Sequence, residues 1–383
     1  MIYLDHAATT PVLPYAFTVM KPWLNGSMIG NPSSLHSAGK QARDAVETAR
    51  EKVAQLINAS PDEIFFTSGG TESNNMVLQG AAVARRNGVF ISSGIEHHAI
   101  LNQKDLLHRK YGVELVCAAT RRDGVICIED LVDLIQKKTP YLVSVMLANN
   151  ETGVVQPIKE IAKLCYKFGA IFHTDAVQAI GHMDVDVKAL GVDMLSLSGH
   201  KFGAPDGVGV LYIRKNAQSW LEPIMYGGSQ ERNMRAGTEN VAAIVGLGAA
   251  AGWTIEHIES EICWYQYLKD MFMMTLNTEF GEEVRTNGCG NVLPNIISIT
   301  IPGVQSESLL LMMDADDVCI SAASACSAGS PKPSHVLTAM GITKDEANCT
   351  VRISLGRANK RDEVVDAAKL LAKNVKRIRN MYH

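Results

Sequence analysis

Short apolar runs that alternate with helix-like stretches constrain the fold of this chain more than any other feature. Runs of strand length occur at residues 64–67, 89–91, 142–147, 170–173, 194–197 and 208–213. Between them, apolar residues recur at helical spacing, as at Ile158, Ile161 and Cys165. Strands that alternate with helices imply crossover connections. We therefore expect an α/β fold whose mainly parallel sheet is covered by helices on both faces.

The pattern changes near Gly248, which predicts a second, smaller domain. A long helix is expected near residues 253–276, strands at 296–300 and 351–355, and then a closing helix. The apolar stripe of that closing helix consists of Val364, Val365, Ala368, Leu371, Ala372, Val375 and Ile378. A chain of 383 residues is long for one hydrophobic core. We predict a large domain over residues 12–254 and a smaller α+β domain formed by residues 1–11 and 255–383.

Composition and charge argue against several classes of partner. Hydrophobic residues make up 46% of the chain and charged residues 20%, and the net charge of −4 disfavours nucleic acid or a membrane surface. No apolar run approaches the ~20 residues that span a bilayer, and residues 1–10 show no secretory signal, so we expect a cytoplasmic protein. The eight cysteines form no C-x-x-C pair, which favours reduced thiols over a zinc site.

The residues that follow the first strand suggest a phosphate-binding turn. Ser68-Gly69-Gly70-Thr71 comes directly after the strand and leads into a helix. Glycines let the backbone approach a phosphate, and a helix N-terminus offers unpaired N–H groups. The alternative is a plain glycine turn with a threonine cap. The dinucleotide pattern G-x-G-x-x-G is absent here, so a nicotinamide cofactor is not favoured.

Two later strands end at a carboxylate and an amine. Asp175 follows the strand at 170–173, and Lys201 follows the strand at 194–197. Burying a carboxylate requires a cationic partner, for which a protonated pyridinium nitrogen qualifies. A desolvated lysine loses its proton readily and becomes the nucleophile for Schiff-base chemistry. The alternatives are an aspartate that caps the next element and a solvated surface lysine.

A histidine pair, His97-His98, raises the question of a metal. Adjacent side chains diverge and do not easily share one ion, and no clear third and fourth ligands accompany them. His173 and Asp175 could point the same way from a strand, so a mononuclear metal site stays an alternative. An imidazole stacked on a flat ring explains one of the pair without a metal.

Taken together, these features describe one ligand, pyridoxal 5′-phosphate (PLP). They supply a phosphate cradle, an acid for a ring nitrogen, a flat stacking group and an amine for an aldehyde. A protein that uses PLP must orient the cofactor and keep its pyridinium protonated.

Longer motifs extend this interpretation, and with them the chain resembles cysteine desulfurases of the NifS/IscS type. These enzymes belong to the class V aminotransferase superfamily of fold-type I PLP-dependent transferases. The resemblance covers nearly the whole length, from the Y-L-D-H-A-A-T-T run at residues 3–10 to R-I-S-L-G-R at 352–357. Other matching stretches are G-N-P-S-S-L-H at 30–36, N-N-E-T-G at 149–153, S-G-H-K at 198–201, R-A-G-T at 235–238, S-A-C-S at 324–327 and P-S-H-V-L at 333–337.

The resemblance implies a PLP-binding large domain and a role for each matching residue. Lys201 would carry the cofactor as a Schiff base, Asp175 would pair with the ring nitrogen, and His97 would stack on the ring. The implied hydrogen-bonding partners of the phenolic side are Asn150 and Gln178, and those of the phosphate are Gly70, Thr71, Ser198 and His200. Thr238 would reach the phosphate of the other subunit, which implies a homodimer.

The resemblance also implies the chemistry and its substrate, L-cysteine. Arg352, assisted by Asn31, would bind the substrate carboxylate, which suits a planar guanidinium. Lys201 would move the α-proton, and the Cys326 thiolate would take the substrate sulfur as a persulfide and release L-alanine. Small residues around Cys326 suit a moving loop carried by the small domain. A buried structural thiol is the alternative, and it suits Cys319 better.

The sulfur acceptor stays open between an iron–sulfur scaffold and a tRNA-thiolation enzyme. The loop length after Cys326 resembles the branch that hands sulfur directly to such carriers. Asp206 stands where relatives often have lysine, and the chain ends soon after its last helix, without the extension that docks a scaffold. Rival functions are a transaminase or selenocysteine lyase on the same fold, a sulfur-relay protein with a structural PLP site, and a metal-dependent hydrolase.

Overall fold

The computed structural model describes residues 1–322 and 333–381, and a seven-stranded sheet forms its centre. The strand order is β2-β8-β7-β6-β5-β3-β4, and only β8 runs antiparallel to its neighbours. The bounds are β2 Ile64–Thr67, β3 Val89–Ser93, β4 Glu114–Ala118, β5 Leu142–Ser144, β6 Ile171–Asp175, β7 Met194–Ser198 and β8 Gly209–Ile213. The α/β fold with a mainly parallel sheet is confirmed.

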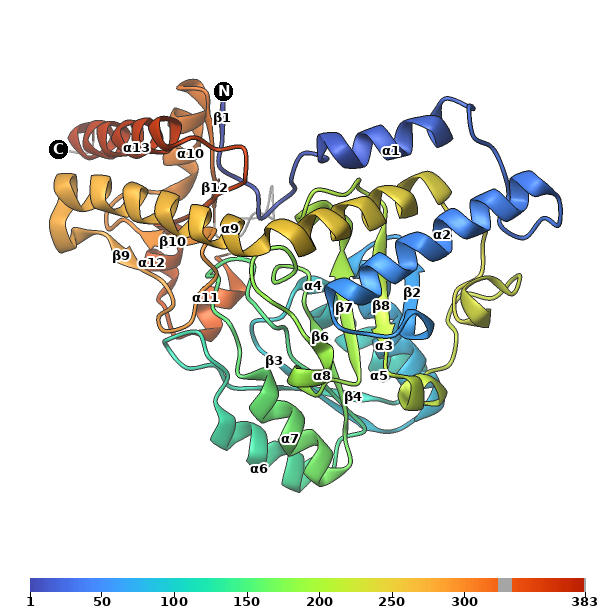
Figure 1. Ribbon diagram of the computed structural model, residues 1–383. Helices are drawn as coiled ribbons and strands as arrows, with labels where there is room; N and C mark the ends of the chain where they lie inside the picture. Colours follow the sequence, from blue (N-terminus) through green and yellow to red (C-terminus); the bar gives the residue numbers. More distant parts are fainter. Residues whose placement is uncertain (323–332, 382–383) are drawn as a thin grey trace.

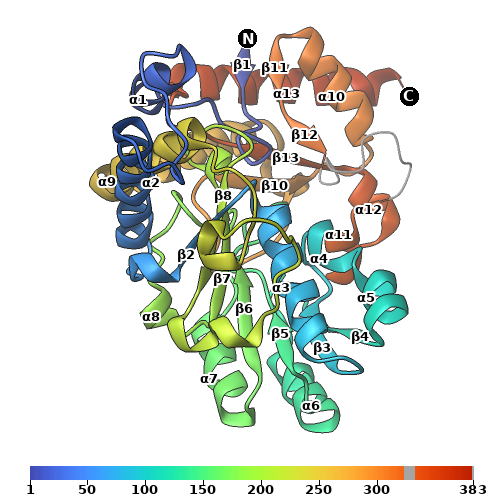
Figure 2. The same cartoon turned by 90° about the vertical axis from the view of Figure 1, so that its right-hand side faces the viewer.

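Two hydrophobic clusters cover the two faces of this sheet. Because side chains alternate along a strand, Phe66 belongs to the cluster that also contains residues of α2, α6 and α7, whereas its neighbour Phe65 belongs to the cluster that contains residues of α3 and α5. The helices concerned are α2 Ser37–Leu56, α3 Gly70–Ala84, α5 Lys104–Tyr111, α6 Ile128–Lys138 and α7 Ile158–Phe168. Figure 2 shows α2 and α3 on opposite sides of the sheet.

All of the expected strands of this sheet form, but strand β4 was not predicted from the sequence. This edge strand buries only Leu115 and Ala118 fully, and Glu114 and Cys117 are exposed. So short and half-exposed a run gives little hydrophobic signal. The structure also ends β5 at Ser144, three residues before the expected end. The chain beyond it still bonds to β6, through Val145 N–H to His173 O.

A second, smaller layer of sheet and helices lies beside the first (Figure 1). Its antiparallel sheet has the order β12-β13-β10-β9, and β1 pairs in parallel with β11. The strands are β1 Ile2–Tyr3, β9 Arg285–Thr286, β10 Ile296–Thr300, β11 Val318–Cys319, β12 Ser321–Ala322 and β13 Thr350–Ser354. Leu4 packs into the same cluster as the β10 and β13 side chains, so the N-terminus joins this part of the molecule. The packing fits the predicted division of the chain, which stays a prediction.

The long helix α9 (Val241–Phe280) runs along both layers. It begins twelve residues before the expected start at about residue 253, because its first turns are small residues with no amphipathic pattern. These turns pack tightly: a Cβ atom on Gly248 would lie 2.6 Å from Ala49 Cα on α2. Within the described residues, α9 alone is long and apolar enough to span a membrane, a test that core helices of soluble proteins also pass.

The remaining helices are shorter, apart from the closing helix α13. They are α1 Pro14–Leu24, α4 His98–Leu101, α8 Val187–Leu190, α10 Ser306–Ala315, α11 His335–Ala339, α12 Lys344–Asn348 and α13 Arg361–Met381. The predicted apolar stripe of α13 is mostly buried against the small sheet, with Val364, Leu371 and Ile378 in its core cluster.

Candidate functional site

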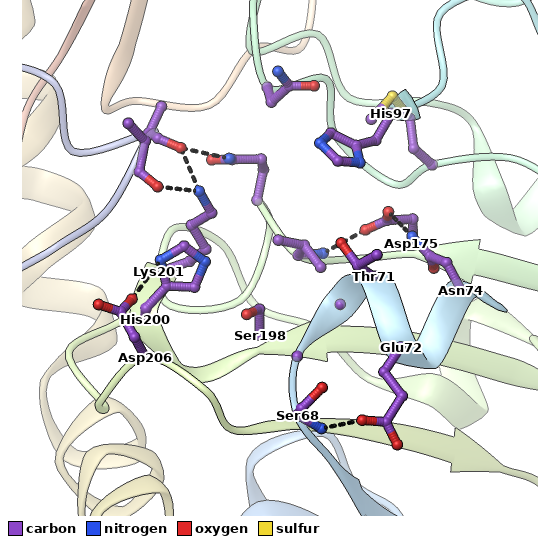
Figure 3. A pocket seen from close by; sticks show the side chains of 18 of the residues that line it. Ser68, Thr71, Glu72, Asn74, His97, Asp175, Ser198, His200, Lys201 and Asp206 are labelled. Atoms are coloured by element: carbon purple, nitrogen blue, oxygen red, sulfur yellow. Dashed lines mark hydrogen bonds and ion pairs between the residues drawn. The ribbon is translucent and has the colours of Figure 1, made fainter. Parts of the chain in front are cut away.

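A cavity of about 410 Å³ opens where β6 and β7 end. The carboxyl ends of parallel strands meet at one edge of a sheet, which is where ligands bind in such folds. The sequence-predicted residues that line this cavity are Gly70, Thr71, His97, Asn150, Asp175, Gln178, Ser198, His200, Lys201 and Arg352. Figure 3 shows Lys201 on one side, His97 and Asp175 on the other, and Thr71 and Ser198 below them.

The start of α3 forms one wall of the cavity. Gly69 has φ +150°, and a Cβ atom on Gly70 would lie 2.5 Å from Val177 Cγ2. Glycine is therefore required for this close approach. The first N–H groups of a helix have no intrahelical acceptor, so this wall offers donors to an anion. Ser198, at the end of β7, adds a hydroxyl to the same cavity.

Asp175 is the last residue of β6 and is almost fully buried. Its carboxylate accepts a 2.6 Å hydrogen bond from Asn74 Nδ2 and a 3.0 Å bond from the Val177 N–H. Both donors are neutral amides. They fix the orientation of the carboxylate and leave its negative charge directed at the cavity.

His97 lies on the same side of the cavity as Asp175, opposite Lys201 (Figure 3). Its Nδ1 atom accepts a 3.1 Å bond from the Ala99 N–H and so caps α4, which places the ring proton on Nε2. Burial lowers the pKa of His97, although the Asp175 charge opposes that shift. A neutral imidazole is therefore fixed with its ring at the cavity.

Lys201 ends the short 3₁₀ turn after β7 and is 9% exposed. Its Nζ atom donates to Ala7 O and Ala8 O, each at 2.6 Å. Gln178 Nε2 donates to the same Ala7 carbonyl at 2.9 Å. The N-terminal segment thus links Lys201 with Gln178 at the cavity wall.

His200 precedes Lys201 and lies close to Asp206. Its Nδ1 atom is 3.1 Å from Thr9 Oγ1 and 3.3 Å from Asp206 Oδ1. Burial and the Lys201 charge lower the pKa of His200 to about 4, although Asp206 opposes that shift. The imidazole is therefore neutral at neutral pH and offers a hydrogen bond rather than a charge.

Arg352 reaches the cavity from β13 of the small sheet. Its Nη2 atom donates to Asp5 Oδ1 at 2.7 Å, and its Nη1 atom donates to Asn150 O at 2.9 Å. The guanidinium is almost fully buried. Among the residues that the structure describes, it is the one basic group of the small sheet that lines the cavity. It is placed to hold an anion against the large sheet.

Two predicted residues do not line this cavity, and one of them, Thr238, is expected at the phosphate of the other subunit instead. Asn31 and Thr238 lie in exposed loops and do not line it, and Asn31 Oδ1 accepts a bond from the Ser33 N–H. Cys326 lies outside the described residues. Conversely, Asn74 and Asp5 were given no role. Asn74 follows Gly70 by four positions on one helix face, and that spacing is the only signal that could have found it.

The alternative metal site at His173 is not supported. His173 Nδ1 bonds with Ser144 Oγ at 2.8 Å, and Nε2 bonds with Ser196 Oγ at 2.9 Å. Both ring nitrogens are thus engaged across three strands. Among the residues that the structure describes, no group of three or more His, Cys, Asp or Glu side chains is arranged to hold a metal ion.

Comparison with known proteins shows the family. The sequence model of the class-V aminotransferase family matches residues 2–366. The chain therefore belongs to the class-V aminotransferase family of PLP enzymes.

Within this family, relatives of the chain include proteins named cysteine desulfurase. The chain is 42% identical to cysteine desulfurase IscS of Dictyoglomus turgidum, over 99% of this chain and 96% of that protein. It is 43% identical to putative cysteine desulfurase IscS 1 of Bacillus subtilis, over 98% and 99% of the two chains. A NifS-like protein from Rickettsia africae superimposes with a TM-score of 0.87 at 33% identity, covering 99% of both chains. The chain is therefore an IscS-like cysteine desulfurase.

The cavity itself fits PLP. The start of α3 leaves room for an anion beside helix N–H donors, and the buried Asp175 carboxylate would suit a protonated ring nitrogen. Gln178 Oε1 and Asn74 Oδ1 are buried acceptors that find no hydrogen-bond partner within residues 1–322 and 333–381. Buried polar atoms without a partner indicate that a ligand or water completes them.

Proposed function

We propose that this protein converts L-cysteine to L-alanine with PLP and transfers the sulfur to Cys326 as a persulfide. One observation carries the proposal. Lys201, Asp175, His97 and Arg352 come from separate strands and loops of an IscS-like chain and line one cavity. An amine, an acid, a flat ring and a carboxylate-binding guanidinium are what PLP chemistry on an amino acid requires.

The residues of the cavity would hold the cofactor at both ends. When bound, PLP supplies a ring that accepts electrons from the substrate α-carbon. Asp175 would keep the ring nitrogen protonated, and His97 would lie against the ring face. The phosphate would bind Gly70, Thr71, Ser198 and His200, and the phenolic side Asn150 and Gln178.

Lys201 and Arg352 would act on the substrate. Lys201 would hold the cofactor through its amine and then carry the substrate α-proton. Arg352 would bind the α-carboxylate through two parallel hydrogen bonds. The structure leaves Asn31 outside the cavity, so the proposal assigns the carboxylate to Arg352 within one subunit.

Cys326 would accept the sulfur. Its thiolate attacks the substrate sulfur, an S–S bond forms, the substrate Cβ–S bond breaks, and the electron pair returns to the carbon skeleton, which is protonated to alanine. The flanking residues support this role. Ser321 pairs with Arg352 across the small sheet, and Ser334 Oγ bonds to Glu151 Oε2, next to Asn150. The residue on one side of the segment that contains Cys326 therefore lies beside Arg352, and Ser334 on the other side contacts the neighbour of Asn150, whose carbonyl accepts from Arg352.

A homodimer completes the proposal. Thr238 is exposed and lies away from the cavity of its own subunit, as expected for a residue that reaches the phosphate of a partner. Large apolar side chains are exposed on loops, with Leu35 96% and Tyr226 78% accessible. A subunit interface would remove such side chains from water. We further propose a cytoplasmic enzyme that delivers sulfur to iron–sulfur cluster assembly or to tRNA thiolation.

Product analysis with purified holoenzyme tests the function. With L-cysteine and a thiol reductant, we expect equal amounts of alanine and sulfide. Cys326→Ser should abolish both but keep the change in visible absorption when cysteine is added. Cys289→Ser is the matched control, because Cys289 is an exposed thiol outside the cavity.

The rival functions predict different results. A transaminase would form a keto acid, a selenocysteine lyase would not need Cys326, and a relay protein would not turn over. If Cys326→Ser kept full sulfide production, the persulfide role would be wrong. Tracing labelled sulfur from the enzyme into co-purifying proteins would identify the acceptor.

A further inference from the structure

Lys201 lines a second cavity besides the one described above. This rear cavity has a volume of about 100 Å³. Its wall comprises His6, residues 10–14, His182, Tyr265 and residues 355–358. In the part of the chain that the structure describes, Lys201 is the one residue that lines both cavities. The amine-bearing side chain therefore separates the substrate side from a smaller space behind it.

The N-terminal segment builds the partition together with Lys201. Ala7 and Ala8 line the front cavity, whereas His6 and Thr10 line the rear cavity. The two carbonyl groups that accept from Lys201 Nζ belong to this segment. Thr10 Oγ1 in turn donates to His200 O at 2.7 Å and ties the segment to the turn that holds Lys201.

Two neutral imidazoles line the rear cavity. His182 Nδ1 lies 3.0 Å from Gln178 O and must carry the ring proton, so Nε2 is an acceptor. Burial, with a smaller contribution from the Lys201 charge, lowers the pKa of His182 to about 4. Burial likewise lowers the pKa of His6 to about 4. His6 Nδ1 is buried and meets no hydrogen-bond partner in the described part of the chain.

The charged groups of the rear cavity are also incompletely paired. Arg357 Nε lies 3.3 Å from Glu261 Oε1, and Arg357 Nη2 donates to Phe202 O at 3.1 Å. Tyr265 donates to Glu261 as well. Arg357 Nη1, however, is buried and unsatisfied as far as the structure describes the chain. A buried donor and a buried acceptor on the wall of one small polar space indicate bound water.

We propose that the rear cavity holds water through which Lys201 exchanges its proton with solvent, on the side opposite the substrate. This inference rests on the proton-carrying role of Lys201 in the proposed function. Lys201, once it has taken a proton from the substrate α-carbon, passes a proton to a rear water, and that water releases one toward the solvent. The neutral amine is restored by the same path. The exposed residues of its wall, Pro11, Val12, Pro14 and Ala358, are where the cavity reaches the surface.

The test is the loss of deuterium from α-deuterated L-alanine in H₂O, followed by NMR with holoenzyme. Alanine contains no sulfur, so this readout is independent of desulfuration. Ala358→Leu narrows the outlet without removing a polar group, and we expect exchange to fall several-fold. Ala189→Leu is the matched control, since Ala189 is an exposed alanine on α8 that lines neither cavity. His182→Gln, which alters the acceptor on the wall, should lower exchange in the same way.

Two further measurements separate this inference from the proposed function. A high-resolution crystal structure of the apo protein should show water bonded to His6 Nδ1 and Arg357 Nη1, and a dry rear cavity would overturn the inference. Full retention of deuterium by the wild-type enzyme, or exchange unchanged in both variants, would also overturn it. An enzyme that exchanges alanine but releases no sulfide from cysteine would refute desulfuration and leave the inference standing.

Discussion

Arg352 and Asp5 form a 2.7 Å ion pair that joins the small sheet to the N-terminal segment beside the Lys201 cavity. A second bond runs from Arg352 to Asn150 O, so the guanidinium is fixed before any substrate binds. Fixed geometry lowers the entropic cost of binding a carboxylate. By fixing the Arg352 guanidinium, Asp5 of the N-terminal segment should therefore increase the affinity for the substrate carboxylate.

Replacing Arg352 should weaken the binding of cysteine. Hydrogen bonds to charged groups contribute about 1.5–3 kcal/mol, so we expect Arg352→Gln to raise KM by roughly 10- to 100-fold. Arg352→Lys should recover only part of this loss, because an ammonium lacks the planar two-donor geometry. Steady-state kinetics of alanine formation measures the effect. Equal KM values for the Gln variant and the wild type would exclude Arg352 from the substrate site.

Asn74 should determine how tightly PLP is held, because it orients the acid that faces the ring nitrogen. Removing its 2.6 Å bond to Asp175 in Asn74→Ala costs about 1–2 kcal/mol, so we expect PLP to dissociate roughly 10-fold more readily. Titration of the apo protein with PLP, followed by absorbance, gives the dissociation constant. Asn75→Ala is the control, because Asn75 bonds to Thr71 O and does not line the cavity. Identical PLP dissociation constants for the two variants would show that Asn74 does not contribute to cofactor binding.

The contrast between Asp175 and Asn74 shows what the sequence reveals. Asp175, Ser198 and Lys201 each follow a recognisable strand, and parallel strands bring their carboxyl ends to one edge. Their neighbourhood could therefore be predicted from local patterns. Asn74 bonds to a residue 101 positions away, and no local pattern encodes that contact.

The place of Arg352 in the cavity could not be predicted from local sequence patterns either. It belongs to an antiparallel strand of another sheet, and only the packing of the two sheets brings it to the cavity. The family resemblance supplied its role, as it did for Asn31 and Thr238, which do not line the cavity of their own subunit. The early start of α9 was missed for a different reason, because its small residues pack closely without an amphipathic pattern.

The buried ion pair of Arg50 and Glu231 should be a main determinant of stability. Arg50 donates twice to Glu231, at 2.8 and 2.9 Å, and both side chains are almost fully buried. Without Glu231, the buried Arg50 charge keeps the 3.2 Å pair with Glu47, whose side chain is 53% exposed, and loses its buried partner. Breaking a buried pair costs about 3–5 kcal/mol. We expect Glu231→Gln to lower the free energy of unfolding by this order in urea denaturation.

The exposed pair of Lys138 and Glu114 provides the control for that experiment. Both side chains are largely accessible, at 40% and 53%. Exposed pairs contribute at most about 1 kcal/mol, so Glu114→Gln should change the unfolding midpoint little. Similar decreases in the free energy of unfolding of the two variants would show that burial does not determine how much the Arg50–Glu231 pair contributes to stability.

Glu96 lies directly before His97 and is fully buried near the candidate site. Its Oε1 atom bonds to Ser93 Oγ and to the Met146 N–H, whereas Oε2 is buried without a partner among the described residues. Burial, reinforced by the Asp175 charge, raises the pKa of Glu96 to about 8, although its hydrogen bonds oppose the shift. The folded protein therefore holds a proton on this carboxyl at neutral pH.

Glu96 should make stability fall as the pH rises. In the unfolded chain this carboxyl ionises near pH 4.5, the ordinary value, whereas in the folded protein it ionises at about 8. Between these two pH values the folded state binds one proton more than the unfolded state. The stabilisation that this proton provides is complete below pH 4.5 and is lost as the pH rises to about 8. The free energy of unfolding falls by up to about 1.4 kcal/mol per pH unit in this window. Glu96→Gln keeps the shape but does not ionise. Urea denaturation at several pH values should therefore show a flatter decline for this variant than for the wild type. Other titrating groups, such as Glu151 and His182, are present in both proteins, so their effects cancel when the two stability curves are subtracted. Parallel curves of stability against pH would mean that Glu96 is ionised in the folded protein.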